Sequence, residues 1–299
     1  MIACSLRFLM VLLAVGLVAS RLNAQEPIAP QPVTIEGAAA YVYKSIDGID
    51  LRSHVFAPAE TTVAPRAAIV FFFGGGWTGG TVQQFVPQAK HFAQRGMVAI
   101  VADYRVAQRH NTTPFAAMAD AKSAIRWVRS HAKALGLDPA RIAAAGGSSG
   151  GHIAASAAVF DAYDERSEDA RVSSKPDALI LFNPALDTSR TQNRFGDRAL
   201  EGSVSHHMKA APPPTIIFHG RADTTVPFER SEAFCTAATK LRSTCMVIGY
   251  DGAPHGFFNL RGDDPARKEW YRQTLLEADR FLTKLGYLSS PSPSATLNR

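Results

Sequence analysis

The residues best suited to chemistry begin with a serine flanked by glycines. Residues 145–152 read AGGSSGGH, after a short apolar run and before a small-residue stretch that suits a helix. A strand, a serine turn and a helix form the context of a nucleophile elbow, Gly-x-Ser-x-Gly, in which a strained turn exposes the serine hydroxyl. The pattern fits in two registers, so its spacing leaves both Ser148 and Ser149 open as the nucleophile. The alternative is a glycine- and serine-rich helix start without chemistry.

A serine hydroxyl attacks only when a base takes its proton and an acid orients that base. Asp223 stands in HGRADTTVP at residues 219–227, and His255 stands in DGAPHGF at residues 251–257. Each follows an apolar run, and the carboxyl ends of parallel strands meet at one edge of a sheet. The chain order Ser, Asp, His is the one that this strand–turn–helix arrangement requires. Asp251 is a rival acid, but it lies too close to His255 on one loop to reach the far ring nitrogen.

A third glycine-rich segment could stabilise negative charge on a reacting carbonyl. Residues 73–77 read FGGGW and follow another apolar run. Glycine leaves its N–H open to approach, and each such donor lowers an acyl-transfer barrier by about 2.7–4 kcal/mol. We expect Gly75 and Gly76 to form an oxyanion hole with the backbone N–H of Ser149. A phosphate-binding loop is excluded because no Gly-Lys-Ser/Thr follows.

Short apolar runs and amphipathic stretches alternate along the chain and must position these loops. Strands are predicted at residues 66–73, 97–103, 141–145, 178–182, 215–218 and 245–250. Helices are predicted at residues 83–95, 114–135, 149–160, 228–241 and 265–285. This alternation predicts an α/β fold with a doubly wound, mostly parallel sheet and helices on both faces. The polar residues 184–213 interrupt it and are predicted to be a lid-like insertion at the active site.

The N-terminus has the pattern of a secretory signal peptide. Arg7 precedes an apolar stretch at residues 8–19, which is shorter than a membrane span, and a small residue follows at Ala24. We expect cleavage after Ala24, with Ser20 as second choice, and therefore a periplasmic or secreted protein. An uncleaved anchor is the alternative. No later apolar run is long enough to span a bilayer.

Composition sets the remaining boundaries. The 299 residues are 46% hydrophobic and 19% charged, which suits one large core and excludes a disordered chain. Removing residues 1–24 lowers the formal net charge from +6 to +4, and scattered basic residues give no nucleic-acid-binding pattern. We divide the remainder into a lead-in at residues 25–40, one catalytic domain at 41–287 and a disordered tail at 288–299. The oligomeric state is left open.

Export also changes how the cysteines are interpreted. Cys4 leaves with the signal peptide, so Cys235 and Cys245 remain. In an oxidising compartment we expect these two to form a structural disulfide, with two buried free thiols as the alternative. A metal site is not expected, because zinc needs three or four ligands.

The motifs together resemble those of the α/β-hydrolase superfamily. They are GGGW, the elbow GGSSGGH, HGRADTTVP and HGFF, and the resemblance covers residues 40–285. The nearest members are carboxylesterases related to hormone-sensitive lipase and to bacterial feruloyl and acetylxylan esterases. There a glycine pair and a histidine follow the nucleophile by two, three and four positions, which selects Ser148. The resemblance implies ester hydrolysis without a metal or organic cofactor, and with export it implies acyl or feruloyl esters on plant carbohydrates.

One position departs from the family pattern, and several other residues have a structural interpretation beside a functional one. Phe73 stands where related enzymes often have a histidine, so we expect packing to hold the glycine loop. Trp77 could form a wall of the substrate pocket or pack in the core, and His207 could reach the pocket from the insertion. His152 and His219 are expected to brace the site. Asp103 and Arg105 are expected to form an ion pair.

Two other functions remain. A serine peptidase of the same fold would use the same three residues but usually carries a further large domain, for which this chain has no room. A non-catalytic binding protein on the same scaffold is the other; the presence of Ser148, Asp223 and His255 together argues against it.

Overall fold

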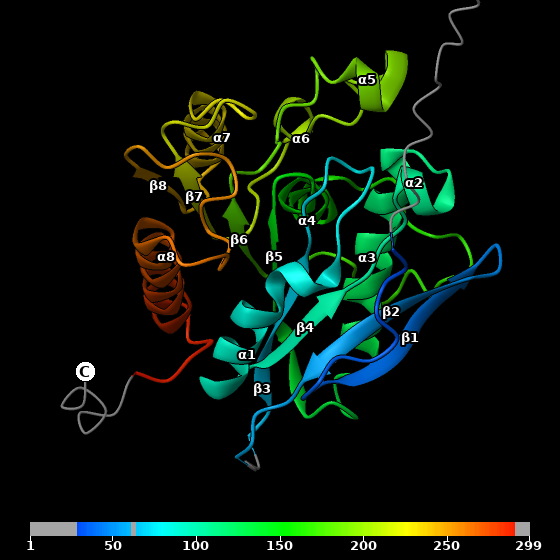
Figure 1. The fold of residues 1–299 in the computed structure, drawn as a ribbon. Coiled ribbons are helices and arrows are strands. Elements are labelled where there is room, and N and C mark those ends of the chain that lie inside the picture. Colours follow the sequence, from blue (N-terminus) through cyan, green and yellow to red (C-terminus); the bar gives the residue numbers. More distant parts are fainter. Residues whose placement is uncertain (1–28, 61–63, 291–299) are drawn as a thin grey trace, which may run out of the picture.

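The computed structural model describes residues 29–60 and 64–290. The predicted signal peptide lies outside them, as do the first residues of the lead-in and most of the tail. The described residues form one eight-stranded sheet in the order β1-β2-β4-β3-β5-β6-β7-β8 (Figure 1). No helix among them is long and apolar enough to cross a membrane.

The central strands of the sheet correspond to the apolar runs of the sequence. They pair in parallel, and most of their side chains are buried because helices cover both faces of the sheet. These strands are β3 (Arg66–Phe72), β4 (Val98–Ala102), β5 (Leu137–Gly147), β6 (Ala178–Phe182), β7 (Thr215–Gly220) and β8 (Cys245–Tyr250). All six were predicted, with β5 extending further at its amino end than expected.

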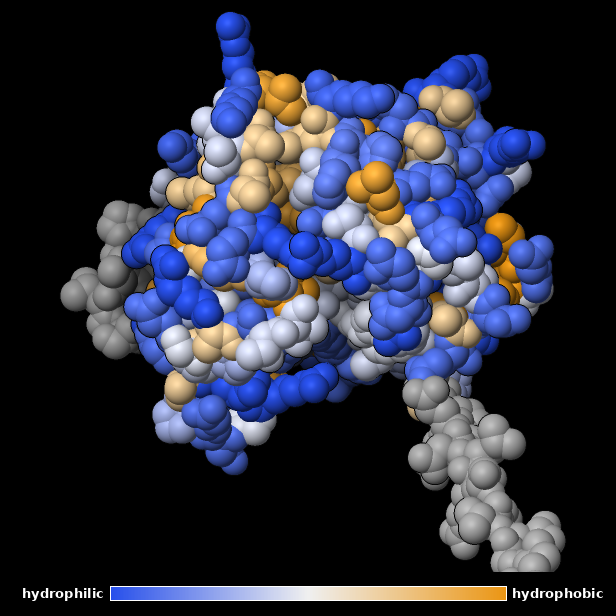
Figure 2. Space-filling view, turned by 90° about the horizontal axis from the view of Figure 1, so that it is seen from above, coloured by the Kyte–Doolittle hydropathy of each residue, from blue (hydrophilic) through white to orange (hydrophobic). Residues whose placement is uncertain are grey.

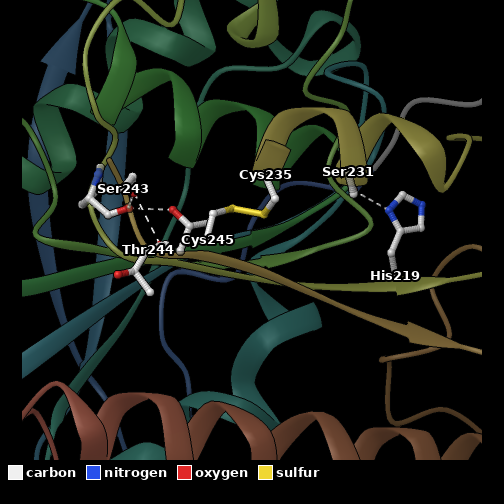
Figure 3. Close-up of a disulfide and its surroundings, with 8 residues drawn as sticks. His219, Ser231, Cys235, Ser243, Thr244 and Cys245 are labelled. Carbon is white, nitrogen blue, oxygen red and sulfur yellow. Dashed lines mark hydrogen bonds between the residues drawn. A yellow bond between two sulfur atoms is a disulfide. The ribbon is translucent and has the colours of Figure 1, made fainter. Parts of the chain in front are cut away.

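Helices cover the two faces of this sheet. On one face α1 (Val86–Gln94) contacts α8 (Pro265–Lys284), where Asp279 bonds to His91 at 3.1 Å and Arg95 at 3.2 Å. On the other face lie α3 (Pro114–Ser130), α4 (Ser149–Val159) and α7 (Glu229–Lys240) (Figures 1 and 3). The prediction of a doubly wound, mostly parallel sheet with helices on both faces is therefore confirmed.

An antiparallel hairpin at one edge was not predicted. Strands β1 (Ala39–Ile46) and β2 (Ile49–Phe56) pair with each other, and β2 also pairs antiparallel with β4. Both strands mix polar and apolar residues, so they lack the continuous apolar runs of the buried strands. A usable signal was the two-residue turn Asp47-Gly48, where both residues have positive φ (51° and 74°), as an Asp-Gly hairpin turn requires.

The hairpin is fastened to α3 by buried charges, which also correct one expectation. Lys44 of β1 donates to Asp120 at 2.8 Å, and the guanidinium of Arg105 binds both oxygens of the same carboxylate at 2.8 Å. The expected pair between Asp103 and Arg105 is wrong, because Asp120 offers Arg105 a two-pronged contact. Asp103 instead faces Arg109, with a nitrogen–oxygen distance of 3.6 Å.

The predicted insertion, residues 184–213, follows β6 and forms a compact segment at the carboxyl edge of the sheet, at the top of Figure 1. It contains α5 (Gln192–Phe195), the short 3-10 helix η2 (Gly196–Arg198) and α6 (Val204–His207). Seen from that side, the surface is mainly hydrophilic with small hydrophobic patches (Figure 2). The insertion therefore lies at the same edge of the sheet as the loops that carry the candidate catalytic residues.

A disulfide joins Cys235 of α7 to Cys245, the first residue of the edge strand β8 (Figure 3). The two Cα atoms lie 5.1 Å apart. The bond closes a short loop and ties a helix of one face to the last strand of the sheet, so it holds α7 in place near the site described next.

Candidate active site

Ser148 occupies the sharp turn between β5 and α4. Its backbone has φ 53° and ψ −118°, a conformation that costs a non-glycine residue energy and marks a functional site. Glycines make the turn possible: a β-carbon on Gly146 would lie 2.5 Å from the Gly150 carbonyl carbon, and one on Gly150 would lie 2.1 Å from the Phe72 oxygen. Ser149 begins the helix and is completely buried. Of the two serines, only Ser148 presents its hydroxyl to the site.

Three residues from three loops meet at this edge. The Oγ atom of Ser148 lies 3.0 Å from Nε2 of His255, and Nδ1 of His255 lies 2.7 Å from Oδ2 of Asp223. The carboxylate can only accept, so Nδ1 carries the proton and Nε2 is free to accept one from the serine. Asp251, the rival acid, is exposed and contacts Arg221 at 3.0 Å. The arrangement is that of a nucleophile, a base and an acid that orients the base.

Asp223 is held by donors on both of its oxygens. The backbone N–H groups of Thr225 and Val226 donate to Oδ1 at 2.8 and 2.9 Å, while His255 and His219 face Oδ2. Burial would raise the pKa of Asp223, but hydrogen bonds from the two histidines and the Val226 amide hold that pKa well below its usual range. The carboxylate therefore stays ionised at neutral pH.

His219 is buried behind Asp223, and both of its ring nitrogens have hydrogen-bonding partners. Its Nε2 lies 3.0 Å from the Val226 carbonyl and 3.3 Å from Asp223, both of which only accept, so Nε2 carries the hydrogen. Its Nδ1 then accepts from the hydroxyl of Ser231 at 2.7 Å (Figure 3). Ser231 belongs to α7, the helix that the disulfide holds, so this helix supports the acid through His219.

The glycine loop after β3 lies directly against the serine turn. A β-carbon on Gly74 would be 2.9 Å from the Gly147 oxygen and 3.4 Å from the β-carbon of Ser148. Gly75 and Gly76 have positive φ (147° and 61°), and a β-carbon on Gly75 would meet the Gly79 oxygen at 2.3 Å. Within the described residues, no hydrogen bond uses the N–H of Gly75 or Gly76. Both groups remain free for a ligand oxygen.

Phe73 is held by more than packing. Its ring stacks on Tyr104 with centroids 4.1 Å apart, and the Tyr104 hydroxyl donates to the Phe73 carbonyl at 2.7 Å. Tyr104 follows β4, the neighbouring strand, so the sheet itself fixes the start of the glycine loop. A stacked aromatic pair and one buried hydrogen bond stand where related enzymes often have histidine.

Trp77 closes the other end of the loop and belongs to the core. It is 4% exposed, its Nε1 donates to Nδ1 of His152 at 3.3 Å, and its ring meets the edge of Phe195 at 5.0 Å. These contacts favour the core-packing interpretation of Trp77, and its role as a pocket wall stays a prediction. The opposite ring nitrogen of His152 donates to the carbonyl of Gly202 at 2.8 Å, so His152 links this loop to the insertion.

His207 lies away from these residues. Its ring packs against Phe160 at 5.2 Å, and both line a cavity of about 330 Å³ beside Pro176 and Pro213, which precede β6 and β7. Ser148 directly precedes α4 and Phe160 directly follows it, and the eleven helical residues between them span about 16 Å. The structure gives the expected substrate contact of His207 no support, because the insertion returns to the amino edge of the sheet before β7, and that contact stays a prediction.

No group of three or more His, Cys, Asp or Glu side chains within residues 29–60 and 64–290 is arranged to hold a metal ion. The chemistry that the geometry can support is nucleophilic attack by Ser148, with charge on the attacked oxygen facing the glycine loop. A parallel sheet with a serine elbow and this order of acid and base defines the α/β-hydrolases.

Comparison with known proteins narrows this class. The BD-FAE family model matches residues 54–193. The structure of Thermogutta terrifontis esterase 2 phosphorylated by paraoxon is 48% identical, covers 86% of this chain and 98% of that one, and has a TM-score of 0.81. Structures of that esterase with propionate and butyrate bound are 47% and 45% identical, with TM-scores of 0.79 and 0.80, and cover 86% of this chain and 97% of theirs. The chain belongs to the carboxylesterases of the α/β-hydrolase superfamily.

Curated relatives include a carboxylic ester hydrolase, in agreement with this family, and also a xylanase. A probable carboxylic ester hydrolase of Mycobacterium tuberculosis, LipM, is 31% identical over 71% of this chain and 53% of its own length. Endo-1,4-beta-xylanase B of Butyrivibrio fibrisolvens is 28% identical over 69% of this chain and 34% of its own length. The chain spans about half the length of the first curated relatives it matches.

Burial of His152 predicts a measurable pH dependence of stability. Burial lowers its pKa from 6.5 to about 4, so below pH 6.5 the unfolded chain binds a proton that the folded chain refuses. This group alone should lower the free energy of unfolding by about 2 kcal/mol between pH 7 and pH 5. Urea denaturation at the two pH values measures the loss.

The matched control is His152→Gln, which keeps an acceptor for Trp77 and a donor for Gly202 but does not titrate. The variant should lose about 2 kcal/mol less than the wild type over the same pH interval. Equal losses in the two proteins would contradict a buried neutral His152.

Proposed function

We propose that this protein is a serine carboxylic-ester hydrolase in which Ser148, His255 and Asp223 form the catalytic triad. The observation that carries the proposal is the unbroken chain of contacts from Ser148 to His255 at 3.0 Å and from His255 to Asp223 at 2.7 Å. Family membership supports the reaction class, and the geometry supports the choice of these three residues.

The reaction begins when Ser148 attacks the ester carbonyl and His255 takes its proton. Asp223, kept ionised by its donors, stabilises the imidazolium that forms. The carbonyl oxygen becomes an oxyanion and binds the N–H groups of Gly75, Gly76 and Ser149. The positive end of the α4 dipole adds to this stabilisation, because Ser149 is the first residue of that helix.

Collapse of this intermediate expels the alcohol, which takes the proton from His255, and leaves an acyl group on Ser148. Water then attacks the acyl carbonyl while His255 removes its proton, and the same oxyanion site stabilises the second intermediate. His255 returns the proton to Ser148 as the acid leaves. The cycle needs only groups of the chain and water.

Exchange of the nucleophile tests this mechanism. Ser148→Ala should lower kcat for p-nitrophenyl acetate by at least about a thousandfold, because the residual rate comes only from binding and the oxyanion site. The matched control is Ser149→Ala, whose buried side chain does not reach His255 and whose N–H remains, so its kcat should stay within about tenfold of wild type. Wild-type turnover by Ser148→Ala would refute the proposed nucleophile.

The proposed substrates are short-chain acyl or feruloyl esters of plant carbohydrates. Support comes from the BD-FAE match, from the similarity to a xylanase, and from the propionate and butyrate bound to the Thermogutta esterase. Both kinds of substrate have a bulky carbohydrate alcohol, and they differ in the acyl group, which is small in an acetyl ester and aromatic in a feruloyl ester.

A chain-length series measures this preference. With p-nitrophenyl esters, kcat/KM should be highest for two to four acyl carbons and fall by about tenfold or more at eight and above. The same enzyme should release acetate from acetylated xylan or ferulate from feruloylated arabinoxylan, with Ser148→Ala as the blank. Maximal activity on long acyl chains, or no release from either polysaccharide, would contradict the proposed substrates.

We further propose that residues 1–24 direct export and that the mature enzyme is periplasmic or secreted. The disulfide between Cys235 and Cys245 supports an oxidising compartment. The exported protein should begin at Gln25 by N-terminal sequencing, whereas Leu13→Asp, which breaks the apolar stretch, should leave an uncut chain in the cytoplasm. Export would be contradicted if the wild-type protein were found in the cytoplasm with its N-terminus still at Met1.

A further inference from the structure

We propose that Gln84 is a positioning residue that joins the glycine loop to the loop of His255 through Asn259, so that the oxyanion site and the base share one support. The proposal rests on the ester-hydrolase function above. It concerns residues 84 and 259, which no motif of the sequence singles out.

The first contact fixes the glycine loop. The side-chain oxygen of Gln84 accepts a hydrogen bond from the N–H of Gly74 at 2.6 Å. Gly74 is the residue that touches the serine turn, and the peptide units after it carry the N–H groups of Gly75 and Gly76. Holding the Gly74 amide therefore sets the direction from which the next two amides point at the substrate.

The second contact reaches the histidine loop. Nε2 of Gln84 donates to Oδ1 of Asn259 at 2.9 Å, and Nδ2 of Asn259 donates to the Gly256 carbonyl at 2.8 Å. Gly256 directly follows His255 and also donates its N–H to Asn183 at 3.2 Å. The bridge thus ends one peptide unit from the catalytic imidazole.

The two side-chain amides have one self-consistent orientation. The Gly74 N–H can only donate, so the oxygen of Gln84 must face it and the NH₂ group must face Asn259. At the other end the Gly256 carbonyl can only accept, so the NH₂ group of Asn259 faces it and its oxygen faces Gln84. Donor meets acceptor at every step, and flipping either amide would break two hydrogen bonds.

Aromatic packing holds together the two parts of the chain that the bridge of Gln84 and Asn259 connects. Gln84 lies on η1 (Val82–Phe85), and the ring of Phe85 stacks between Phe71 of β3 at 5.2 Å and Phe258 at 5.6 Å. Asn259 is 8% exposed. From α1, Gln88 donates to the Phe258 carbonyl at 3.3 Å. The same strand and loop that the polar bridge joins are therefore also clamped by rings.

Loss of the bridge should affect the chemical step rather than substrate binding. The oxyanion donors and the base must be placed within about 0.5 Å, and a displacement of about 1 Å can cost a hundredfold in rate. If Gln84 and Asn259 only stabilised the fold, replacing them would lower the thermal midpoint of unfolding but would not lower kcat selectively while leaving KM unchanged.

The test replaces each end of the bridge by an apolar side chain of similar size, Gln84→Met and Asn259→Leu. For p-nitrophenyl acetate, kcat should fall about 10- to 100-fold with KM within about threefold of wild type. Affinity for an aryl trifluoromethyl ketone, which mimics the tetrahedral intermediate, should fall by the same factor as kcat. The double variant should lose no more than the worse single variant, because both changes break one unit.

Gln83→Met is the matched control, since Gln83 is exposed on the same turn and its side chain does not reach the loop. It should retain wild-type kcat and inhibitor affinity. Wild-type kcat in a folded Gln84→Met or Asn259→Leu, a change confined to KM, or multiplicative losses in the double variant would overturn the bridge. If one variant does not fold, the other tests the bridge from its opposite end. Failure of the ester-hydrolase function would differ, because the wild type itself would then hydrolyse no ester.

Discussion

The close approach of α4 to strands β3 and β5 is the constraint on which the site depends. Without β-carbons at Gly146 and Gly150, the helix start reaches the backbone of Phe72, and the turn between them forces Ser148 to φ 53°. In this conformation the hydroxyl lies 3.0 Å from Nε2 of His255, and the positive end of the helix faces the place where the proposed mechanism puts the oxyanion. The loops that carry the glycine segment, Asp223 and His255 start from the carboxyl ends of other parallel strands of the same sheet, so they meet Ser148 at one edge.

Three histidines surround the site, and hydrogen-bonding partners assign each a different role. His152 is completely buried between a donor and a carbonyl, so burial lowers its pKa to about 4 and it stays neutral. His219 is held by the hydroxyl of Ser231 on one ring nitrogen and by acceptors on the other. Only His255 combines partial exposure with an ionised carboxylate on one nitrogen and a hydroxyl on the other. Residue type alone did not separate these roles; the partners did.

The sequence was informative where a feature is local. The parallel strands, the long helices and the positions of Asp223 and His255 follow from apolar runs and short motifs within a few residues, whereas the choice of Ser148 over Ser149 came from the family resemblance. The edge hairpin was missed because β1 is largely exposed, although Asp47-Gly48 marked its turn. Contacts between residues far apart in the chain could not be predicted from the sequence. Gln84 and Asn259 are 175 positions apart, and Asp120 replaced Asp103 as the partner of Arg105 from another element.

The oxyanion loop shows how a fold can replace a missing side chain. Where related enzymes often use one histidine, this chain supports the loop from three directions: Tyr104 on the neighbouring strand, Gln84 below Gly74, and His152 behind Trp77. The third support continues to Gly202, and Phe195 packs on Trp77, so the insertion is part of it. Because the insertion carries these contacts, its conformation is coupled to that of the glycine loop, where the proposed oxyanion donors lie.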